Sequence, residues 1–319
     1  MKIIVISNQL EEKHYEMIRD AAAYAKAGVF FYASEEDIPE ENKDAEIIYG
    51  FGIKTAKTSK DLKWLCVPAA GVDFLMKPDC FANPDAILTN SAGAYGVSIS
   101  EHMIAVLLMM MRRLPEFIKG SIESEWLSPR KQRSIKNSRI TVLGTGDIGC
   151  NFAKRAAAFE PASLVGVCRS GVCDEKFFDS VIKVDELDKI LPQTDVLAMS
   201  LPATAETENI LSRERIALLP EGAYVVNVGR GTAIDEEALA DALEEGHLAG
   251  AALDVFRKEP LSKDSRLWTV PNLLITPHVA GNLTLDVTKD KNVQMFCEDL
   301  KNYADGKPLQ HVVDRNRGY

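Results

Sequence analysis

A glycine-rich stretch with the spacing of a phosphate-binding turn lies near the middle of the chain. Its residues are Gly144, Thr145, Gly146, Asp147, Ile148 and Gly149. The short apolar run of Ile140, Val142 and Leu143 before it predicts a strand, and the pattern after it is helical as far as Phe159. In that context Gly144 permits a tight turn, Gly146 lets the backbone approach a pyrophosphate, and Gly149 lets the helix lie close to the strand. We therefore expect phosphate binding at the helix start, with a plain structural turn as the alternative.

Three segments that end predicted strands carry polar residues in apolar surroundings. Arg230 lies between two glycines, Glu259 precedes a proline and His278 follows one. Each residue alone is as consistent with a structural role as with chemistry. All three follow strands of the sheet that carries the glycine turn, and ligands of open parallel sheets bind at the carboxyl ends of the strands. Because the segments would meet at that edge, we expect them to share one site.

Short apolar runs alternate with helical or turn segments along nearly the whole chain, which predicts an α/β fold with parallel sheets. Strands are predicted at residues 2–6, 29–32, 46–49, 62–67, 86–89, 140–143, 163–167, 195–199, 224–228, 249–253 and 273–275. Helices are predicted at residues 10–26, 97–114, 150–159, 185–190, 213–218, 235–245 and 284–303. Asp235 is a suitable N-cap and Gly246 a suitable helix stop. The first five strands form a small parallel unit, and the last six form a doubly wound sheet.

Two connections in the first part of the chain can position a ligand or a hinge. Between the strands at 62–67 and 86–89 lies a tight turn whose Ala70 and Gly71 could offer backbone N–H groups to an anion. A simple turn is an equal alternative there. Residues 90–94 are small and predict an interdomain hinge. The helix that follows is apolar nearly all round, so we expect it to be buried between layers or domains.

Composition excludes several classes of function. The chain has 319 residues, enough for two moderate domains, and a net charge of -10, which argues against nucleic acid as a partner. The longest apolar run, residues 103–111, is too short to span a bilayer, and the chain opens on a strand pattern, so we expect a soluble, cytoplasmic protein without a membrane partner. The six cysteines show no zinc-like spacing. We therefore expect no metal site, and the cysteines receive no chemical role.

The chain closely resembles the D-isomer-specific 2-hydroxyacid dehydrogenases, in particular the glyoxylate/hydroxypyruvate reductases, over nearly its whole length. The motifs are AAGVD at Ala69–Asp73, SEHMIAVLLMMMR at Ser100–Arg112, LGTGDIG at Leu143–Gly149, LPATAET at Leu201–Thr207, LLPEGAYVVNVGRG at Leu218–Gly231, ALDVFRKEPL at Ala252–Leu261 and TPHVAG at Thr276–Gly281. The resemblance implies a Rossmann domain, residues 94–282, inserted into a smaller flavodoxin-like α/β substrate domain, residues 1–93 plus 283–319. It also implies a homodimer whose long hinge-side helix helps form the contact.

The resemblance further implies hydride exchange between a nicotinamide cofactor and a small 2-oxo acid or 2-hydroxy acid. Arg230 would grip the substrate carboxylate and carbonyl, His278 would donate a proton to the carbonyl oxygen, and Glu259 would favour the protonated ring. Ala70 and Gly71 would bind the carboxylate through their backbone. The implied cofactor-binding residues are Gly144, Thr145, Gly146, Asp147, Ile148, Gly149, Cys168, Arg169, Ser170, Leu201, Pro202, Thr207, Val228, Asp254 and Gly281.

One departure from the family pattern bears on the cofactor. NAD-using members carry an acid at the end of the second nucleotide-domain strand, where this chain has Cys168 followed by Arg169 and Ser170. A thiol neither repels a 2′-phosphate nor accepts bonds from the ribose diol, whereas arginine can pair with the phosphate. We therefore predict a preference for NADPH, with NADH as a possible substitute. The alternative to an enzyme is a dinucleotide-sensing scaffold or corepressor with little turnover, because fold alone does not establish function.

Overall fold

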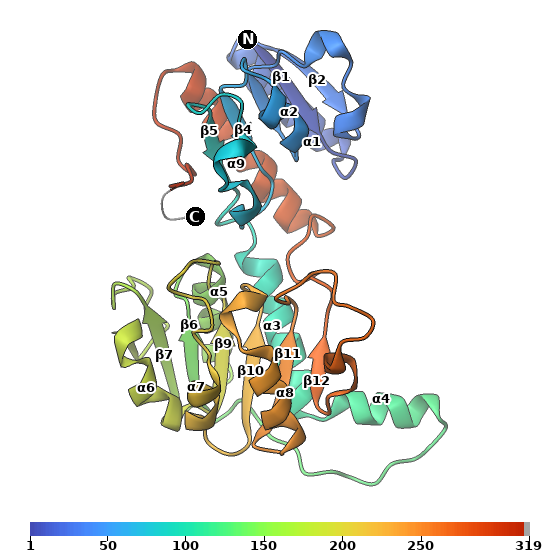
Figure 1. Cartoon of the computed structure of the whole chain (residues 1–319), viewed down its shortest axis with the longest axis vertical. Coiled ribbons are helices and arrows are strands. Elements are labelled where there is room, and N and C mark those ends of the chain that lie inside the picture. Colours follow the sequence, from blue (N-terminus) through green and yellow to red (C-terminus); the bar gives the residue numbers. More distant parts are fainter. Residues whose placement is uncertain (316–319) are drawn as a thin grey trace. The chain divides into compact units, whose positions relative to one another are not determined.

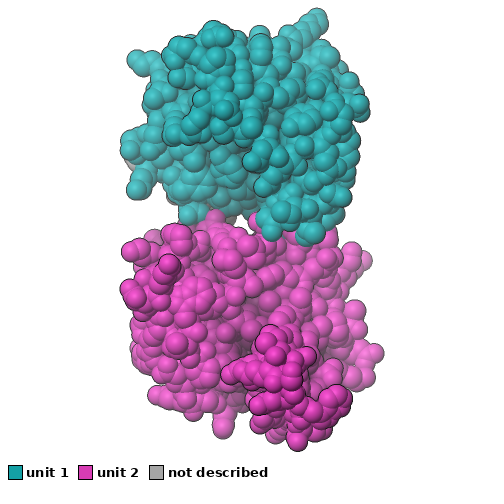
Figure 2. Space-filling model, turned by 90° about the vertical axis from the view of Figure 1, so that its right-hand side faces the viewer, with its two compact units in different colours: residues 1–95, 282–319 teal, residues 96–281 magenta. Residues whose placement is uncertain are grey.

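The computed structural model describes residues 1–315, which divide into two compact units, coloured separately in Figure 2. Unit 1 comprises residues 1–95 together with the chain from residue 282 on, and unit 2 comprises residues 96–281. The boundaries expected from the sequence, 93/94 and 282/283, lie within two residues of these positions. Among the described residues, none of the helices is both long and apolar enough to cross a membrane.

Unit 1 is built on a five-stranded parallel sheet (Figure 1). Its strands are β1 (Lys2–Ile6), β2 (Gly28–Tyr32), β3 (Ile47–Tyr49), β4 (Trp64–Cys66) and β5 (Ile87–Thr89). Its helices are α1 (Glu12–Tyr24), α2 (Ile53–Thr58) and α9 (Asp286–Ala304). The strand order β2-β1-β3-β4-β5 is the flavodoxin-like order, which confirms the fold class predicted for this part of the chain.

Both faces of the unit 1 sheet are covered, which explains why its strands are apolar runs. On one face, Ile18 of α1 and Phe296 of α9 are buried against strand residues that include Trp64. On the other face, Ile4 belongs to a second cluster that includes Ala56 of α2. Because successive residues of a strand point to opposite faces, a sheet covered on both sides needs apolar residues at every strand position.

Unit 2 is built on a seven-stranded parallel sheet in the order β12-β11-β10-β9-β6-β7-β8. Its strands are β6 (Arg139–Leu143), β7 (Ser163–Cys168), β8 (Ser180–Lys183), β9 (Val196–Met199), β10 (Ala223–Asn227), β11 (Leu248–Leu253) and β12 (Leu273–Ile275). This is the doubly wound Rossmann order with one further strand, so the predicted fold class is confirmed. The predicted count of six strands is wrong, because β8 is a short edge strand with only two apolar residues.

Helices cover the unit 2 sheet on both faces. They are α3 (Gly96–Met111), α4 (Leu114–Ile122), α5 (Asp147–Ala157), α6 (Leu187–Ile190), α7 (Arg213–Leu218) and α8 (Glu236–Glu244). Helices α6, α7 and α8 share one core cluster with the strands, whereas α3 packs against α5 and against β10 and β11. Asp235 caps α8 by accepting a hydrogen bond from the backbone of Ala238, and Gly246, at φ +76°, follows the helix, as predicted.

The segment after α3 differs from the prediction. The single helix predicted at residues 97–114 ends at Met111. A second helix, α4, begins at Leu114, where the sequence predicts a polar connector. Arg113 between them adopts a left-handed conformation with φ +55°, which breaks the first helix, and Pro115 suits the first turn of the second. Apolar periodicity continues across this break and therefore does not reveal it.

Candidate active site

The glycine turn joins β6 to α5 with the backbone geometry that its spacing predicts. Gly144 has φ +105°, a conformation that side chains disfavour. A Cβ on Gly149 would lie 1.8 Å from the carbonyl oxygen of Gly144, so only glycine lets α5 approach the turn this closely. A Cβ on Gly146 would meet nothing within 4 Å. The N-cap of α5 is therefore open, and its first turn can present backbone N–H groups to an anionic group of a dinucleotide.

The three segments expected to carry chemistry follow neighbouring strands. Strand β10 pairs with β11 and β11 with β12, all parallel, so their carboxyl ends lie at one edge of the sheet. Arg230 comes three residues after β10, Glu259 follows β11 and His278 follows β12. The glycine turn after β6 belongs to the same edge, because β10 and β6 both pair with β9.

Glu259 and His278 form a direct pair. The Nδ1 atom of His278 lies 2.7 Å from Oε2 of Glu259, and the other carboxylate oxygen accepts a hydrogen bond of 2.8 Å from the backbone N–H of Phe256. The histidine side chain is 48% exposed and the glutamate 35%, so a small solute can reach the ring. Because Glu259 engages Nδ1, the ring is oriented with Nε2 as the nitrogen that can exchange a proton with a ligand.

The loop that carries Arg230 is held by Asn227, a buried side chain that the sequence did not single out. Its amide donates to the carbonyl of Arg230 at 3.0 Å, and its side-chain oxygen accepts from the backbone N–H of Gly229 at 3.0 Å. A Cβ on Gly231 would lie 1.9 Å from the backbone of Phe256, so the loop packs directly against the segment after β11. The glycines on both sides of the arginine therefore serve close packing.

Asp254 anchors the segment that carries the predicted catalytic histidine. Its carboxylate is 2% exposed and accepts hydrogen bonds from the Thr276 hydroxyl at 2.6 Å and from the backbone N–H groups of Val279 and Ala280 at 2.9 and 3.0 Å. The hydroxyl of Thr276 also lies 3.3 Å from Nε2 of His102 on α3. Burial lowers the pKa of His102 despite the opposing charge of Asp254. A carboxylate has about four acceptor positions, so one remains for a further donor such as a carboxamide.

The loop after β7 contains the three residues that the sequence assigns to the cofactor's ribose and phosphate. Ser170 donates from its hydroxyl to the carbonyl of Val172 at 3.1 Å and lies 3.4 Å from Sγ of Cys168. Burial opposes ionisation of Cys168, but hydrogen bonds from Ser170, Thr145 and nearby backbone outweigh it and lower its pKa. Arg169 is exposed and contributes to the lowered pKa of Glu206, in the loop after β9.

The other residues assigned to the cofactor lie in loops at the same carboxyl edge of the unit 2 sheet. Thr207 donates to the carbonyl of Pro202 at 2.7 Å and accepts from the backbone of Thr204, which closes the loop after β9 into a compact turn. Val228 is buried, and its N–H donates to the end of β9. Leu201 lies in this loop, and Gly281 is the last residue of unit 2.

Ala70 and Gly71 belong to unit 1, in the turn after β4. The amide of Asn90 donates to the carbonyl of Ala70 at 2.8 Å, and the backbone N–H of Ser91 donates to Ala69 at 2.9 Å. The C-terminal segment supports Asn90 in turn, since the carbonyl of His311 accepts its backbone N–H. The turn is therefore fixed by residues that the sequence suggested only as part of a hinge.

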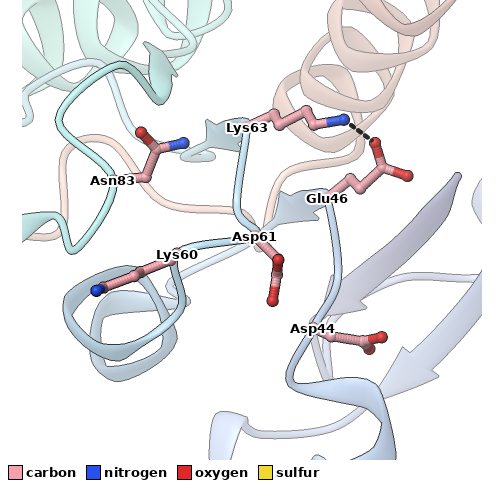
Figure 3. A pocket seen from close by; sticks show the side chains of 6 residues that line it. All are labelled: Asp44, Glu46, Lys60, Asp61, Lys63 and Asn83. Atoms are coloured by element: carbon pink, nitrogen blue, oxygen red, sulfur yellow. Dashed lines mark hydrogen bonds and ion pairs between the residues drawn. The ribbon is translucent and has the colours of Figure 1, made fainter.

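A hollow in unit 1 has a different character. It is lined by Asp44, Glu46, Lys60, Asp61, Lys63 and Asn83 (Figure 3). Glu46 and Lys63 form an ion pair of 2.7 Å, and the other labelled side chains point in different directions rather than toward one another (Figure 3). These two residues directly precede β3 and β4, at the amino ends of the strands, whereas Ala70 and Gly71 follow a carboxyl end. We assign this hollow no ligand.

Comparison with known proteins decides the family. A sequence profile of the D-isomer specific 2-hydroxyacid dehydrogenase NAD-binding domain matches residues 104–280, more than half of the chain. The chain belongs to the D-isomer specific 2-hydroxyacid dehydrogenases. The resemblance stated from the motifs is thereby confirmed, and the protein is an NAD(P)-dependent 2-hydroxyacid dehydrogenase or reductase.

Three relatives show how far the similarity of this dehydrogenase extends. Glyoxylate/hydroxypyruvate reductase A of Salmonella typhimurium is 30% identical over 81% of this chain and 82% of its own. The crystal structure of a family protein from Aeromonas salmonicida is 33% identical, with a TM-score of 0.86 over 98% of this chain and 99% of that one. A family structure from Xanthobacter autotrophicus, in complex with NADPH and MES, is 26% identical, with a TM-score of 0.81 over 100% and 99%.

Proposed function

We propose that this dehydrogenase reduces a small 2-oxo acid to the D-2-hydroxy acid, with NADPH as its preferred cofactor. The observation that carries the proposal is the Glu259–His278 pair, in which a carboxylate orients an accessible imidazole at the edge of the sheet where the glycine turn lies. A bound nicotinamide dinucleotide would supply the hydride for the carbonyl carbon. The residues of the chain must supply the proton and the binding of the acid.

His278 is the proposed proton donor. As an imidazolium it would give its Nε2 proton to the carbonyl oxygen as negative charge develops there, and it would take the proton back in the reverse reaction. The carboxylate of Glu259 lies 2.7 Å from Nδ1 and keeps the ring oriented. The single backbone N–H of His278 is shared between the carbonyl oxygens of Asp254 at 2.8 Å and Thr276 at 3.0 Å, which holds this segment in place although φ of His278 is +54°.

Arg230 is the proposed clamp on the acid. A planar guanidinium can donate to a carboxylate and to the neighbouring carbonyl oxygen at once, which a lysine ammonium does less well. Its Nη1 donates to the carbonyl of Gly229 at 2.9 Å, and Asn227 holds the backbone on either side. The arginine is therefore presented from a fixed loop. Ala70 and Gly71 would add backbone donors to the substrate carboxylate.

The preference for NADPH rests on the loop after β7. Cys168 occupies the position where an acidic side chain would repel a 2′-phosphate, and Arg169 is exposed beside it. The hydroxyl of Ser170 can turn from the carbonyl of Val172 to an incoming phosphate oxygen. The NADPH-bound relative from Xanthobacter autotrophicus is compatible with this proposal. The other proposed cofactor contacts come from the glycine turn, the loop after β9, Val228, Asp254 and Gly281.

The proposed assembly is a cytoplasmic homodimer that uses α3 and the α4 segment. Large apolar side chains of this segment are exposed, with Ile118 at 50%, Ile122 at 79% and Trp126 at 101%. Burial against a second copy would remove them from water. A solution mass of twice 35.1 kDa is expected.

Turnover with a panel of 2-oxo acids tests the proposal. Glyoxylate, hydroxypyruvate and pyruvate are each offered with NADPH, and oxidation of the cofactor is followed for the wild type and for His278→Ala. We expect turnover with at least one acid and a kcat lower by about 10²–10⁴-fold in the variant. Tight NADPH binding without turnover on any acid would instead favour a dinucleotide-sensing scaffold.

A further inference from the structure

Two cysteines meet beside the glycine turn. Sγ of Cys150, in the first turn of α5, lies 3.6 Å from Sγ of Cys173, in the loop between β7 and β8. Both thiols are directed at the same acceptor, since their distances to the carbonyl oxygen of Thr145 are 3.1 and 3.9 Å. Both side chains are partly exposed, whereas Cys66, Cys80 and Cys297 are buried. This dithiol therefore differs from the buried thiols of the core.

The geometry allows a covalent bond after a small movement. A disulfide requires the sulfur atoms to lie about 2.05 Å apart, so the present 3.6 Å must shorten by about 1.5 Å. Cys173 lies in a loop at the edge of the sheet, where β8 is the last strand, and such a loop can move more readily than α5. We propose that Cys150 and Cys173 form a reversible disulfide that lowers the affinity of the enzyme for its dinucleotide.

The oxidant is a small disulfide, and the exchange balances in two steps. The thiolate of Cys173 attacks the oxidant, which forms a mixed disulfide and releases one thiol. Cys150 then loses its proton and attacks Sγ of Cys173 as a thiolate, which forms the protein disulfide, breaks the mixed disulfide and releases the second half of the oxidant, which takes up the proton as a thiol. The net change is loss of two hydrogens from the protein and gain of two by the oxidant. Burial and contact with Cys173 raise the pKa of Cys150 to about 12, so Cys150 is seldom a thiolate at neutral pH and is unsuited to the first attack on the oxidant.

The disulfide would act on the cofactor loop through two connections. It removes both thiol donors from the carbonyl of Thr145, inside the glycine turn. It also draws Cys173 toward α5, and Val172 next to it is hydrogen-bonded to both Cys168 and Ser170. Residues 168–173 of the loop would therefore move together. Loss of one hydrogen bond to a charged group weakens binding by at least about tenfold, and this is the rise that we expect in the Kd of NADPH.

The cross-link itself is tested with glutathione disulfide as the probe. The protein is incubated with an excess of the probe, remaining thiols are alkylated, and the peptides are mapped by mass spectrometry in a Cys168→Ser background, which removes the other partly exposed thiol of the loop. We expect a Cys150–Cys173 peptide that dithiothreitol abolishes. Cys150→Ser should instead retain a glutathione adduct on Cys173. Absence of the cross-linked peptide overturns the proposal.

The effect on affinity is measured in the otherwise unchanged protein by fluorescence titration with NADPH. The oxidised wild type should bind at least tenfold more weakly than the reduced form and recover on reduction, whereas Cys173→Ser, which can form neither the disulfide nor an adduct at this position, should respond less than twofold to the same oxidant. Equal affinity of the cross-linked and reduced wild type overturns the regulatory role. This part rests on the proposed dinucleotide site, but the peptide map does not. A reduced enzyme that binds no NADPH therefore contradicts the proposed function without affecting the mapped cross-link.

Discussion

The glycine turn offers a matched pair of substitutions that separates folding from cofactor binding. Gly149→Ala places a Cβ 1.8 Å from the carbonyl oxygen of Gly144, whereas Gly146→Ala places one where no atom lies within 4 Å. Both changes add the same methyl group to the same turn. Gly146 has φ -80°, which alanine adopts without strain. Any difference between the variants therefore comes from position alone.

The expected magnitudes follow from these distances. Cβ atoms essentially never approach another atom within 3.0 Å, so α5 and the turn must separate by about 1.2 Å in Gly149→Ala. Overpacking of a close contact costs about 1–3 kcal/mol and sometimes more. For a unit of this size, 3 kcal/mol lowers Tm by roughly 6–12 °C. Gly146→Ala should change the free energy of unfolding by less than about 0.5 kcal/mol, as open surface positions do.

Two assays on the same preparations complete the test. Thermal unfolding is followed by circular dichroism, and NADPH binding by fluorescence titration below the melting range. Gly146→Ala should melt like the wild type but bind NADPH at least about tenfold more weakly, because the methyl group occupies the space that the pyrophosphate needs. A Gly146→Ala variant that binds NADPH normally would refute the assignment of this turn to the cofactor. A Gly149→Ala variant that melts like the wild type would refute the packing argument.

Three further substitutions test individual roles in the site. Glu259→Gln should lower kcat for reduction by about 10-fold or more, because a neutral amide makes a weaker hydrogen bond to Nδ1 of His278 than a carboxylate does and holds the ring less firmly, and an unchanged kcat would remove the glutamate from this role. Arg230→Lys should lower kcat/KM for the 2-oxo acid by about 10–100-fold, the value of one charged hydrogen bond, with NADPH affinity as the control. The double variant Cys168→Asp, Arg169→Ala should lower the ratio of kcat/KM for NADPH over NADH at least tenfold, and an unchanged ratio would show that this loop does not read the phosphate.

The sequence predicts the two sheets and their classes well, because both are covered on two faces and their strands are therefore nearly continuous apolar runs. Strands 2–6 and 273–275 and helix 213–218 have the predicted bounds. Helix α5 ends at Ala157, two residues before the predicted end at Phe159, and Glu160 beyond it adopts φ +56°. Strand β8 and helix α4 escape prediction, the first because it is a short edge strand and the second because Arg113 breaks an uninterrupted apolar pattern.

The residues that support the site are harder to find from sequence. Asn227 bonds within its own loop, but the apolar strand pattern around it does not single it out. Thr276 and His102 act through hydrogen bonds to residues that other strands and helices bring close, and only the fold reveals these neighbours. The contact between Cys150 and Cys173 is of the same kind, since 23 positions separate the two thiols along the chain. Glycine spacing and strand ends locate a site in the sequence, whereas the buried polar residues that support the site can be identified only from the structure.

Transfer of a label from the cofactor to the product tests the central claim most directly. NADPH carrying deuterium in both positions at C4 of the nicotinamide is incubated with hydroxypyruvate and the enzyme, and the glycerate is examined by mass spectrometry and chiral chromatography. The proposed mechanism predicts one deuterium at C2 of D-glycerate, with the proton on the oxygen taken from solvent through His278. Glycerate without deuterium at C2, or the L-isomer, would contradict it.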